Sequence, residues 1–165
     1  MTDNQDHAQA WAAAITNNTD AVLALFADAL VYDDKRNNDH VTDTAITKAE
    51  LRPKLAPFAN ADKDNGLGIH HFEVLDTIDS RGHNGARAVA ILWQWTAENL
   101  RNYRGIPTQG KSLSTRGQTW HQFDSDGLVD RESTFWNDVP VFQELGIPAI
   151  TPRYWDADFD PSSLG

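Results

Sequence analysis

The chain has 165 residues, of which 40% are hydrophobic and 23% are charged, and it contains no cysteine. That size and apolar share suit one globular domain with a core, expected over residues 1–165 with an irregular tail at 147–165. The formal net charge of −10 argues against binding to nucleic acid or to an anionic membrane surface.

The composition also restricts the compartment and the kinds of metal site. A chain without cysteine forms no disulfide and offers no thiolate to a metal. No apolar run reaches the roughly 18 residues that a membrane-spanning helix needs. The polar, acidic start of the chain is unlike a signal peptide. We therefore expect a cytoplasmic protein without a membrane partner.

The first part of the chain predicts two helices and a strand. Apolar residues on one side indicate a helix over Asp6–Asn17, and Asn17–Asp20 then breaks it and caps a second helix at Thr19–Ala27. The apolar spacing changes to a period of two at Leu30–Asp34, which predicts a strand. The polar residues 35–44 indicate a loop or a short irregular hairpin.

The rest of the chain is mainly strand. Thr47 and Glu50 form a capping-box pattern before a third helix, which Pro57 is expected to limit. Hairpin turns are expected at 81–85 and 124–127, and a longer connection at 99–111. The predicted strands are Ile69–Ile78, Ala86–Trp95, Ser114–Phe123 and Leu128–Trp136. A last helical turn is expected at Val139–Leu145. This order predicts an α+β fold, with about three N-terminal helices on one face of a curved, mostly antiparallel sheet.

One acidic residue at the end of the first strand is a candidate general base. A strand that buries Tyr32 carries Asp34 toward the same interior, because side chains two residues apart share a face. Burial without a cation raises the pKa of a carboxyl group and makes it a base suited to neutral pH. Asp33 has the opposite parity and is expected to be exposed or paired with Lys35 or Arg36. Alternatively, both carboxylates lie in a solvated turn.

Several short motifs, in this order, resemble the SnoaL-like and ketosteroid-isomerase-like enzymes of the NTF2-like superfamily. They are the helix-to-strand junction Ala24–Asp34, the loop Gly105–Lys111, the hairpin Phe123–Val129 followed by Trp136, and Phe142–Gly146. The resemblance runs from the first helix to Gly146. It implies a cone-shaped α+β barrel with a deep pocket, and a homodimer formed through the open sheet face. It also implies that Asp34 is the proton shuttle, as its counterpart is in the isomerases.

The chain departs from the best-known chemistries of that superfamily. The acid/base aspartate of SnoaL-like cyclases falls on Thr134, and their assisting histidine falls on Thr119 if the hairpin Asp124–Gly127 carries one extra residue. The second aspartate of the isomerases also falls on Thr119. Limonene-type epoxide hydrolases carry an Arg-x-Asp unit where this chain has Trp93-Gln94-Trp95. Asp34 is the isomerase-like group that remains, and Thr119 and Thr134 become candidate substrate contacts.

Aromatic residues are available as pocket walls. Besides its place near Asp34, Tyr32 can donate a hydrogen bond to a substrate or to the carboxylate, or it is a core residue with a satisfied hydroxyl. The candidate wall residues are Phe72, Trp93, Trp95 and Trp136.

Histidines are the candidate acid partners of Asp34. His70 and His71 are adjacent, so at most one of them enters the pocket. We expect it to be His71, because family members often carry a polar residue near this strand start; alternatively, one of the two is solvated and the other packs on an aromatic residue. His121 shares a strand face with Thr119. His40 lies in a polar loop, where it either closes over the pocket mouth or is exposed.

The last strand offers a second carboxylate. Glu132, Thr134 and Trp136 alternate, so they share one face. If that face points inward, Glu132 joins the catalytic candidates. Alternatively, Glu132 forms a structural ion pair with Arg87 or with neighbours of Arg131.

The residues predict small-molecule chemistry without a cofactor. No histidine pair has metal-ligand spacing, and Gly66-Leu67-Gly68 does not open a helix as a phosphate loop does. We expect a lyase or isomerase that uses carboxylate acid/base chemistry on a bulky hydrophobic or aromatic molecule, by elimination, dehydration, retro-aldol cleavage or a double-bond shift. The alternatives are an epoxide hydrolase or polyketide cyclase with a rearranged site, and a non-catalytic binding module.

Overall fold

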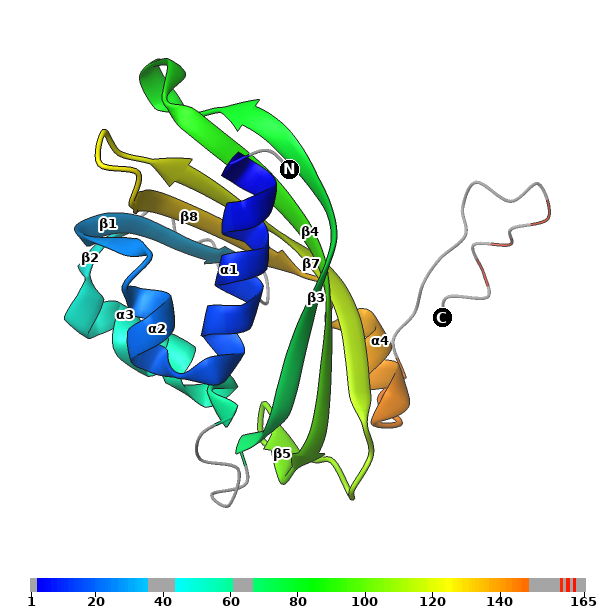
Figure 1. Ribbon diagram of the computed structural model, residues 1–165. Helices are drawn as coiled ribbons and strands as arrows, with labels where there is room; N and C mark the ends of the chain where they lie inside the picture. The colour runs from blue at the N-terminus through cyan, green and yellow to red at the C-terminus, as the bar shows by residue number, and fades with distance from the viewer. Residues whose placement is uncertain are drawn as a thin grey trace.

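The computed structural model describes residues 3–35, 44–60, 67–148, 158, 160 and 162 (Figure 1). The helices are α1 (Asp3–Asn17), α2 (Thr19–Leu23), α3 (Lys48–Leu55) and α4 (Val139–Glu144), with a 3-10 turn at Ala56–Phe58 after α3. The long strands are β1 (Phe26–Lys35), β3 (Leu67–Arg81), β4 (Arg87–Leu100), β7 (Leu113–Phe123) and β8 (Val129–Trp136). The short ones are β2 (Thr44–Thr47), β5 (Asn102–Tyr103) and β6 (Ile106–Pro107).

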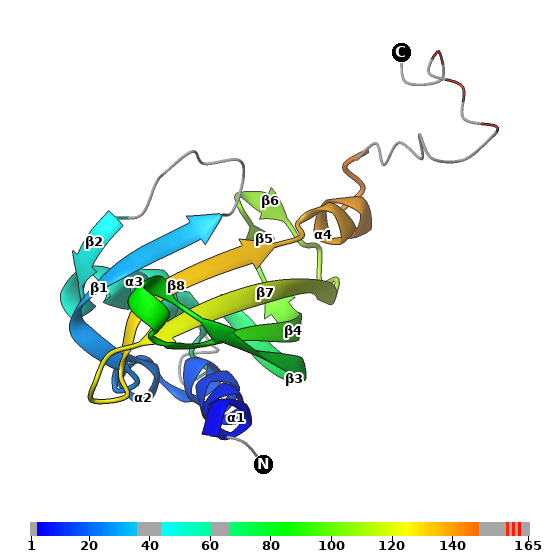
Figure 2. The same ribbon diagram turned by 90° about the horizontal axis from the view of Figure 1, so that it is seen from above.

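Six strands form one curved sheet, in the order β2-β1-β8-β7-β4-β3. All neighbours are antiparallel except β1 and β8, which are parallel. In Figures 1 and 2, α1 crosses one face of the sheet, with α2 and α3 beside it at the β1–β2 end, and α4 follows β8 at the other end. The predicted α+β fold, with its N-terminal helices on one face, is confirmed, although the sheet formed by the described strands does not close into the barrel that the resemblance implies.

Helix α1 packs on the sheet through one apolar stripe. Ala8, Trp11, Ala12 and Ile15 are buried at the helical spacing of i, i+3, i+4 and i+7. The Trp11 ring meets Phe72 of β3 edge to face, with 5.5 Å between ring centroids. The core therefore lies between α1 and the inner face of β3, β4, β7 and β8. None of the described helices combines the length and the apolarity that crossing a bilayer requires.

The helix-to-strand junction differs from the sequence expectation. Helix α2 ends at Leu23 and β1 begins at Phe26, four residues before the predicted start at Leu30. Pairing with the last strand causes this: Phe26 is in register with Val129, whose N–H donates to the Leu25 carbonyl oxygen at 2.9 Å. A contact distant in the sequence thus overrides the local helical spacing.

Other boundaries are close to the predicted ones. The capping box is present, since Glu50 N–H donates to Thr47 Oγ1 at 3.3 Å and Thr47 N–H donates to Glu50 Oε2 at 2.8 Å. Strand β4 extends to Leu100, beyond the predicted end at Trp95, because it pairs with β7 as far as Ala97 and with β3 as far as Leu100. The single domain and the homodimer stay predictions.

Candidate active site

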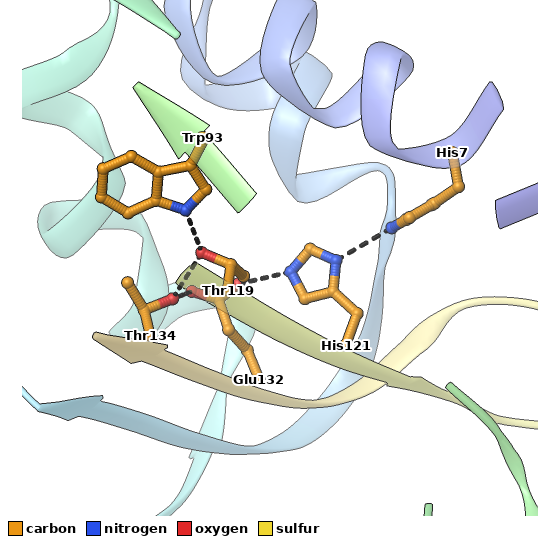
Figure 3. Close-up of polar contacts among 6 residues, drawn as sticks. All are labelled: His7, Trp93, Thr119, His121, Glu132 and Thr134. Atoms are coloured by element: carbon orange, nitrogen blue, oxygen red, sulfur yellow. Dashed lines mark hydrogen bonds and ion pairs between the residues drawn. The ribbon is translucent and has the colours of Figure 1, made fainter. Parts of the chain in front are cut away.

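A chain of buried polar side chains joins α1 to three strands of the sheet (Figure 3). It consists of His7 on α1, Trp93 on β4, Thr119 and His121 on β7, and Glu132 and Thr134 on β8. Their hydrogen bonds are continuous from the His7 ring to the Trp93 indole. Five of the six side chains are buried, and His7 is half-buried.

Sheet register brings these groups together. In the antiparallel pair of β7 and β8, Thr119 is opposite Thr134 and His121 is opposite Glu132. Because residues two apart share a strand face, all four side chains point to the interior. The parallel pairing of β1 with β8 then sets Tyr32 beside Glu132.

The hydrogen bonds converge on the Glu132 carboxylate from two sides. His121 Nε2 lies 3.0 Å from Glu132 Oε2, and His7 Nε2 lies 2.9 Å from His121 Nδ1. On the other side, the Thr134 hydroxyl donates to Glu132 Oε1 at 2.9 Å.

The second side continues to an indole. Trp93 Nε1–H donates to Thr119 Oγ1 at 2.9 Å, and the Thr119 and Thr134 hydroxyl oxygens are 3.0 Å apart. Since the indole only donates and Thr134 already donates to the carboxylate, the Thr119 hydroxyl donates to Thr134 Oγ1. This arm therefore has one fixed direction, toward Glu132.

Burial makes the carboxylate unusual. The Glu132 residue is 3% exposed, and among the described residues the basic side chain that contacts its carboxylate is His121. A buried carboxylate is costly unless hydrogen-bond donors replace its water, and here Thr134 and His121 supply them. The predicted alternative, an ion pair with Arg87, is wrong. The Arg87 guanidinium instead donates to Asn4 Oδ1 at 2.7 Å and lies over the Phe123 ring at 3.6 Å from its centroid.

Glu132 lines a small interior cavity. Its volume is about 20 Å³, room for about one water molecule. Except for two threonines and the carboxylate, its walls are apolar or aromatic, and they are Trp11, Ile15, Tyr32, Leu55, Phe58, Phe72, Trp93, Thr119, Glu132, Thr134 and Trp136. Seven of the residues predicted from the sequence therefore meet in one place: Tyr32, Phe72, Trp93, Thr119, Glu132, Thr134 and Trp136.

A larger pocket of about 230 Å³ shares Phe58 with this cavity. Trp95, a predicted wall residue, lines the larger pocket together with His70 and Tyr103. The Phe58 ring contacts both sites: it stacks on Trp136 at 5.7 Å and meets His70 edge to face at 5.4 Å between centroids. Phe58 is thus the side chain common to the two spaces.

Tyr103 is a fixed donor in the larger pocket. Its hydroxyl donates to Asp138, which also pairs with Arg104 at 2.8 Å. Burial and the Asp138 carboxylate raise the pKa of Tyr103 to about 12, so the phenol stays protonated at neutral pH.

The structure reverses the expected orientation of the two adjacent histidines. His71 is exposed, whereas His70 is buried and lines the larger pocket. Alternation along β3 explains this, because His70 shares a face with the buried Phe72. Trp95 Nε1–H donates to His70 Nδ1 at 3.1 Å, and His70 Nε2 donates to the Leu67 carbonyl oxygen at 2.5 Å. Burial lowers the pKa of His70, which therefore stays neutral with both ring nitrogens bonded.

The acidic pair at the end of β1 also differs from the expectation. Asp33 is buried, not exposed, and Ser133 of the adjacent β8 donates to its carboxylate at 3.2 Å. The reason is that β1 lies between β2 and β8 and is not an edge strand. The backbone of Asp34 is in register with Thr134. The side chain of Asp34, and His40, lie outside the described residues, so their predicted roles stay predictions.

His7 is the member of the network that the sequence did not predict. The signal was present, because His7 precedes the buried Trp11 by four residues and so lies on the apolar face of α1. Desolvation, together with His121 and Arg87, lowers the pKa of His7 from 6.5 to about 3. The ring is therefore neutral at pH 7. Among the described residues, no three histidine or acidic side chains gather as metal ligands.

No family model and no curated protein matches the sequence. Solved structures do match. AclR from Streptomyces galilaeus has a TM-score of 0.66 at 16% identity, covering 91% of this chain and 85% of its own. A phenazine biosynthesis-related protein from Pseudomonas aeruginosa has a TM-score of 0.60 at 14% identity, covering 92% and 85%. SalBIII, an epoxide hydrolase/cyclase-like enzyme in pyran ring formation, has a TM-score of 0.56 at 14% identity, covering 85% and 97%. These likenesses show that the chain has the NTF2-like fold of the SnoaL-like proteins that its sequence resembles.

Proposed function

We propose that the protein is a cofactor-independent lyase or isomerase that moves a proton on a small hydrophobic molecule, with Glu132 as the acid/base group. One observation carries the proposal: a carboxylate 3% exposed lines an aromatic cavity and is held by Thr134 and His121. Buried, oriented carboxylates of this kind are suited to general acid/base catalysis. The predicted role of Asp34 as a base remains a second candidate.

The reaction begins with proton abstraction next to a carbonyl group. Glu132 takes the proton from that carbon, and the electron pair of the broken C–H bond moves to the carbonyl oxygen as an enolate. Return of the proton to a different carbon completes a double-bond shift, whereas expulsion of a group on the next carbon completes an elimination. Such acid/base assistance contributes about 10²–10⁴-fold to the rate.

The volumes of the two cavities suggest that different parts of the substrate occupy each of them. The cavity at Glu132 holds about one water molecule, whereas the adjoining pocket of about 230 Å³ is large enough for the body of an aromatic molecule. The reacting carbon then reaches Glu132 when the Phe58 ring turns aside. Trp93 and Trp136, which line the cavity, supply apolar contact and a fluorescence signal for binding.

The water-sized cavity favours a second candidate, opening of an epoxide by water. In that reaction Glu132 takes a proton from the water molecule, whose oxygen attacks an epoxide carbon while the ring C–O bond breaks. The alkoxide that forms then takes the proton back from Glu132, which gives a diol. SalBIII, which has the same fold, is described as epoxide hydrolase/cyclase-like. Oxygen from ¹⁸O-labelled water appears in the product of this reaction, whereas a double-bond shift incorporates none.

The test uses α-tetralone, a bicyclic aromatic ketone, as a probe of proton abstraction. In D₂O the wild type is expected to catalyse deuterium incorporation next to the carbonyl group. Glu132→Gln is expected to slow it about 100-fold or more and to retain binding, measured by tryptophan fluorescence. His71→Gln, an exposed change, is the matched control.

Two outcomes contradict the assignment. If Asp34→Asn abolishes exchange and Glu132→Gln does not, the base is Asp34. If the wild type binds the ketone and exchanges no proton, and opens no epoxide, the protein is a non-catalytic binding module.

A further inference from the structure

The histidine side of the network reaches from the buried carboxylate to the half-buried ring of His7. The three groups come from α1, β7 and β8, and the two hydrogen bonds between them measure 2.9 and 3.0 Å. His121 is fully buried, and its two ring nitrogens are both used, Nδ1 toward His7 and Nε2 toward Glu132. Among the described residues, His7 Nδ1 has no hydrogen-bond partner.

We propose that His7 and His121 form a proton relay between solvent and Glu132, the group that the proposed function makes the acid/base. His7 and His121 act through Glu132 and are relay residues, without contact to the substrate. The relay thus rests on the proposed function for its use, although it can be measured without any substrate.

The relay uses three arrangements of the protons, each with both hydrogen bonds intact. In the first, Glu132 is ionised, and His121 and His7 both carry their proton on Nε2. A solvent proton then binds His7 Nδ1 while the Nε2 proton of His7 passes to His121 Nδ1, which gives a charged His121 beside the carboxylate. In the third state the Nε2 proton of His121 has passed to Glu132 Oε2. One proton has entered, and every broken N–H bond is matched by a bond formed.

The other side of the network, through Thr134, Thr119 and Trp93, cannot transfer a proton from solvent. Trp93 ends that arm, and an indole N–H donates but does not accept or readily release a proton. Thr119 and Thr134 therefore orient the carboxylate, and the histidine arm exchanges its proton. This asymmetry separates the two arms into one that positions and one that transfers.

The surroundings of His7 suit a group that passes a proton and does not store it. His7 packs edge to face on Phe123, at 4.6 Å between ring centroids, and Arg87 lies over the same phenyl ring. The Arg87 guanidinium is held by Asn4, whose amide donates to Asp79 at 2.8 Å. A positive charge resting on His7 is disfavoured by burial and by the nearby Arg87, and the proton moves inward to the carboxylate.

The experiment measures solvent exchange of the His121 imidazole proton by NMR, with ¹⁵N-labelled histidine in the full chain at pH 7. In the wild type, ¹⁵N shifts are expected to place the proton of both rings on Nε2. His7→Gln keeps an amide donor for His121 Nδ1 but cannot pass a proton. We expect it to slow exchange of the His121 proton at least about tenfold, because exchange then needs local opening of the fold. His71→Gln is expected to leave the rate unchanged.

Two results overturn the relay. If His7 only packs against the sheet, its replacement loosens α1, and exchange in His7→Gln is equal to or faster than in the wild type. A second contradiction needs only the wild type: if His121 at rest carries protons on both nitrogens at pH 7, it has no vacant nitrogen to receive the His7 proton. The exchange experiment uses no substrate, so its result is independent of the test of the proposed function. The relay can be refuted while Glu132→Gln still abolishes proton abstraction from the ketone, and the relay can be supported while the ketone exchanges no proton.

Discussion

Removing His7 should flatten the dependence of stability on pH. The pKa of His7 is about 3 in the fold and 6.5 when the ring is solvated, so the unfolded chain binds a proton between these values and the folded chain does not. Stability therefore falls as pH falls from about 6.5 toward 3. Between pH 7.5 and pH 5.0 this one group accounts for about 2 kcal/mol of lost unfolding free energy.

His7→Gln is the variant that tests this value. It retains a donor for His121 and a good helix former in α1, and it has no proton to titrate. Urea unfolding of wild type and variant at pH 7.5 and pH 5.0 gives the four free energies. The variant should lose about 2 kcal/mol less than the wild type over this interval. Equal losses in the two proteins would refute the account of His7 as a ring kept neutral by burial and by its charged neighbours.

Two further predictions concern the scaffold of the site. Gly117 lies against the Trp93 ring, and a Cβ there would overlap the indole. Gly117→Ala should therefore lower the free energy of unfolding in urea by about 1–3 kcal/mol and shift the Trp93 fluorescence. An unchanged unfolding free energy and an unchanged fluorescence would contradict this packing. Thr47→Ala removes the capping box with Glu50 and should lower the free energy of unfolding by about 1 kcal/mol, whereas Thr47→Ser should lower it little. An equal loss of unfolding free energy in the two variants would contradict a capping role.

The sequence predicted the fold well because its signals are local and repeated. Alternation along β3, β4, β7 and β8, the turns between them and the capping box all act over a few residues, and the resemblance supplied their arrangement. The start of β1 was misplaced because it depends on pairing with β8, about 100 residues away in the chain. Pairing of that kind leaves no mark in the local spacing of apolar residues.

The candidate site was predicted in composition more than in arrangement. Glu132 and Thr134 were recognised as sharing a face, and the structure sets both on the cavity. The prediction for His71 is wrong because Phe72, expected in the same pocket, shares its strand face with His70 and not with His71. His7 was missed because a contact between α1 and β7 cannot be read from either element alone.

The most direct test of the central claim is a crystal structure of the protein with 1-naphthol, the flat phenol that mimics the enol of α-tetralone. We expect the body of the naphthol to lie in the larger pocket beside Trp95, the Phe58 ring to turn aside, and the carbon next to the C–O bond to lie about 3–3.5 Å from a Glu132 carboxylate oxygen. A naphthol bound elsewhere, with the Glu132 cavity closed and Phe58 in place, would contradict it.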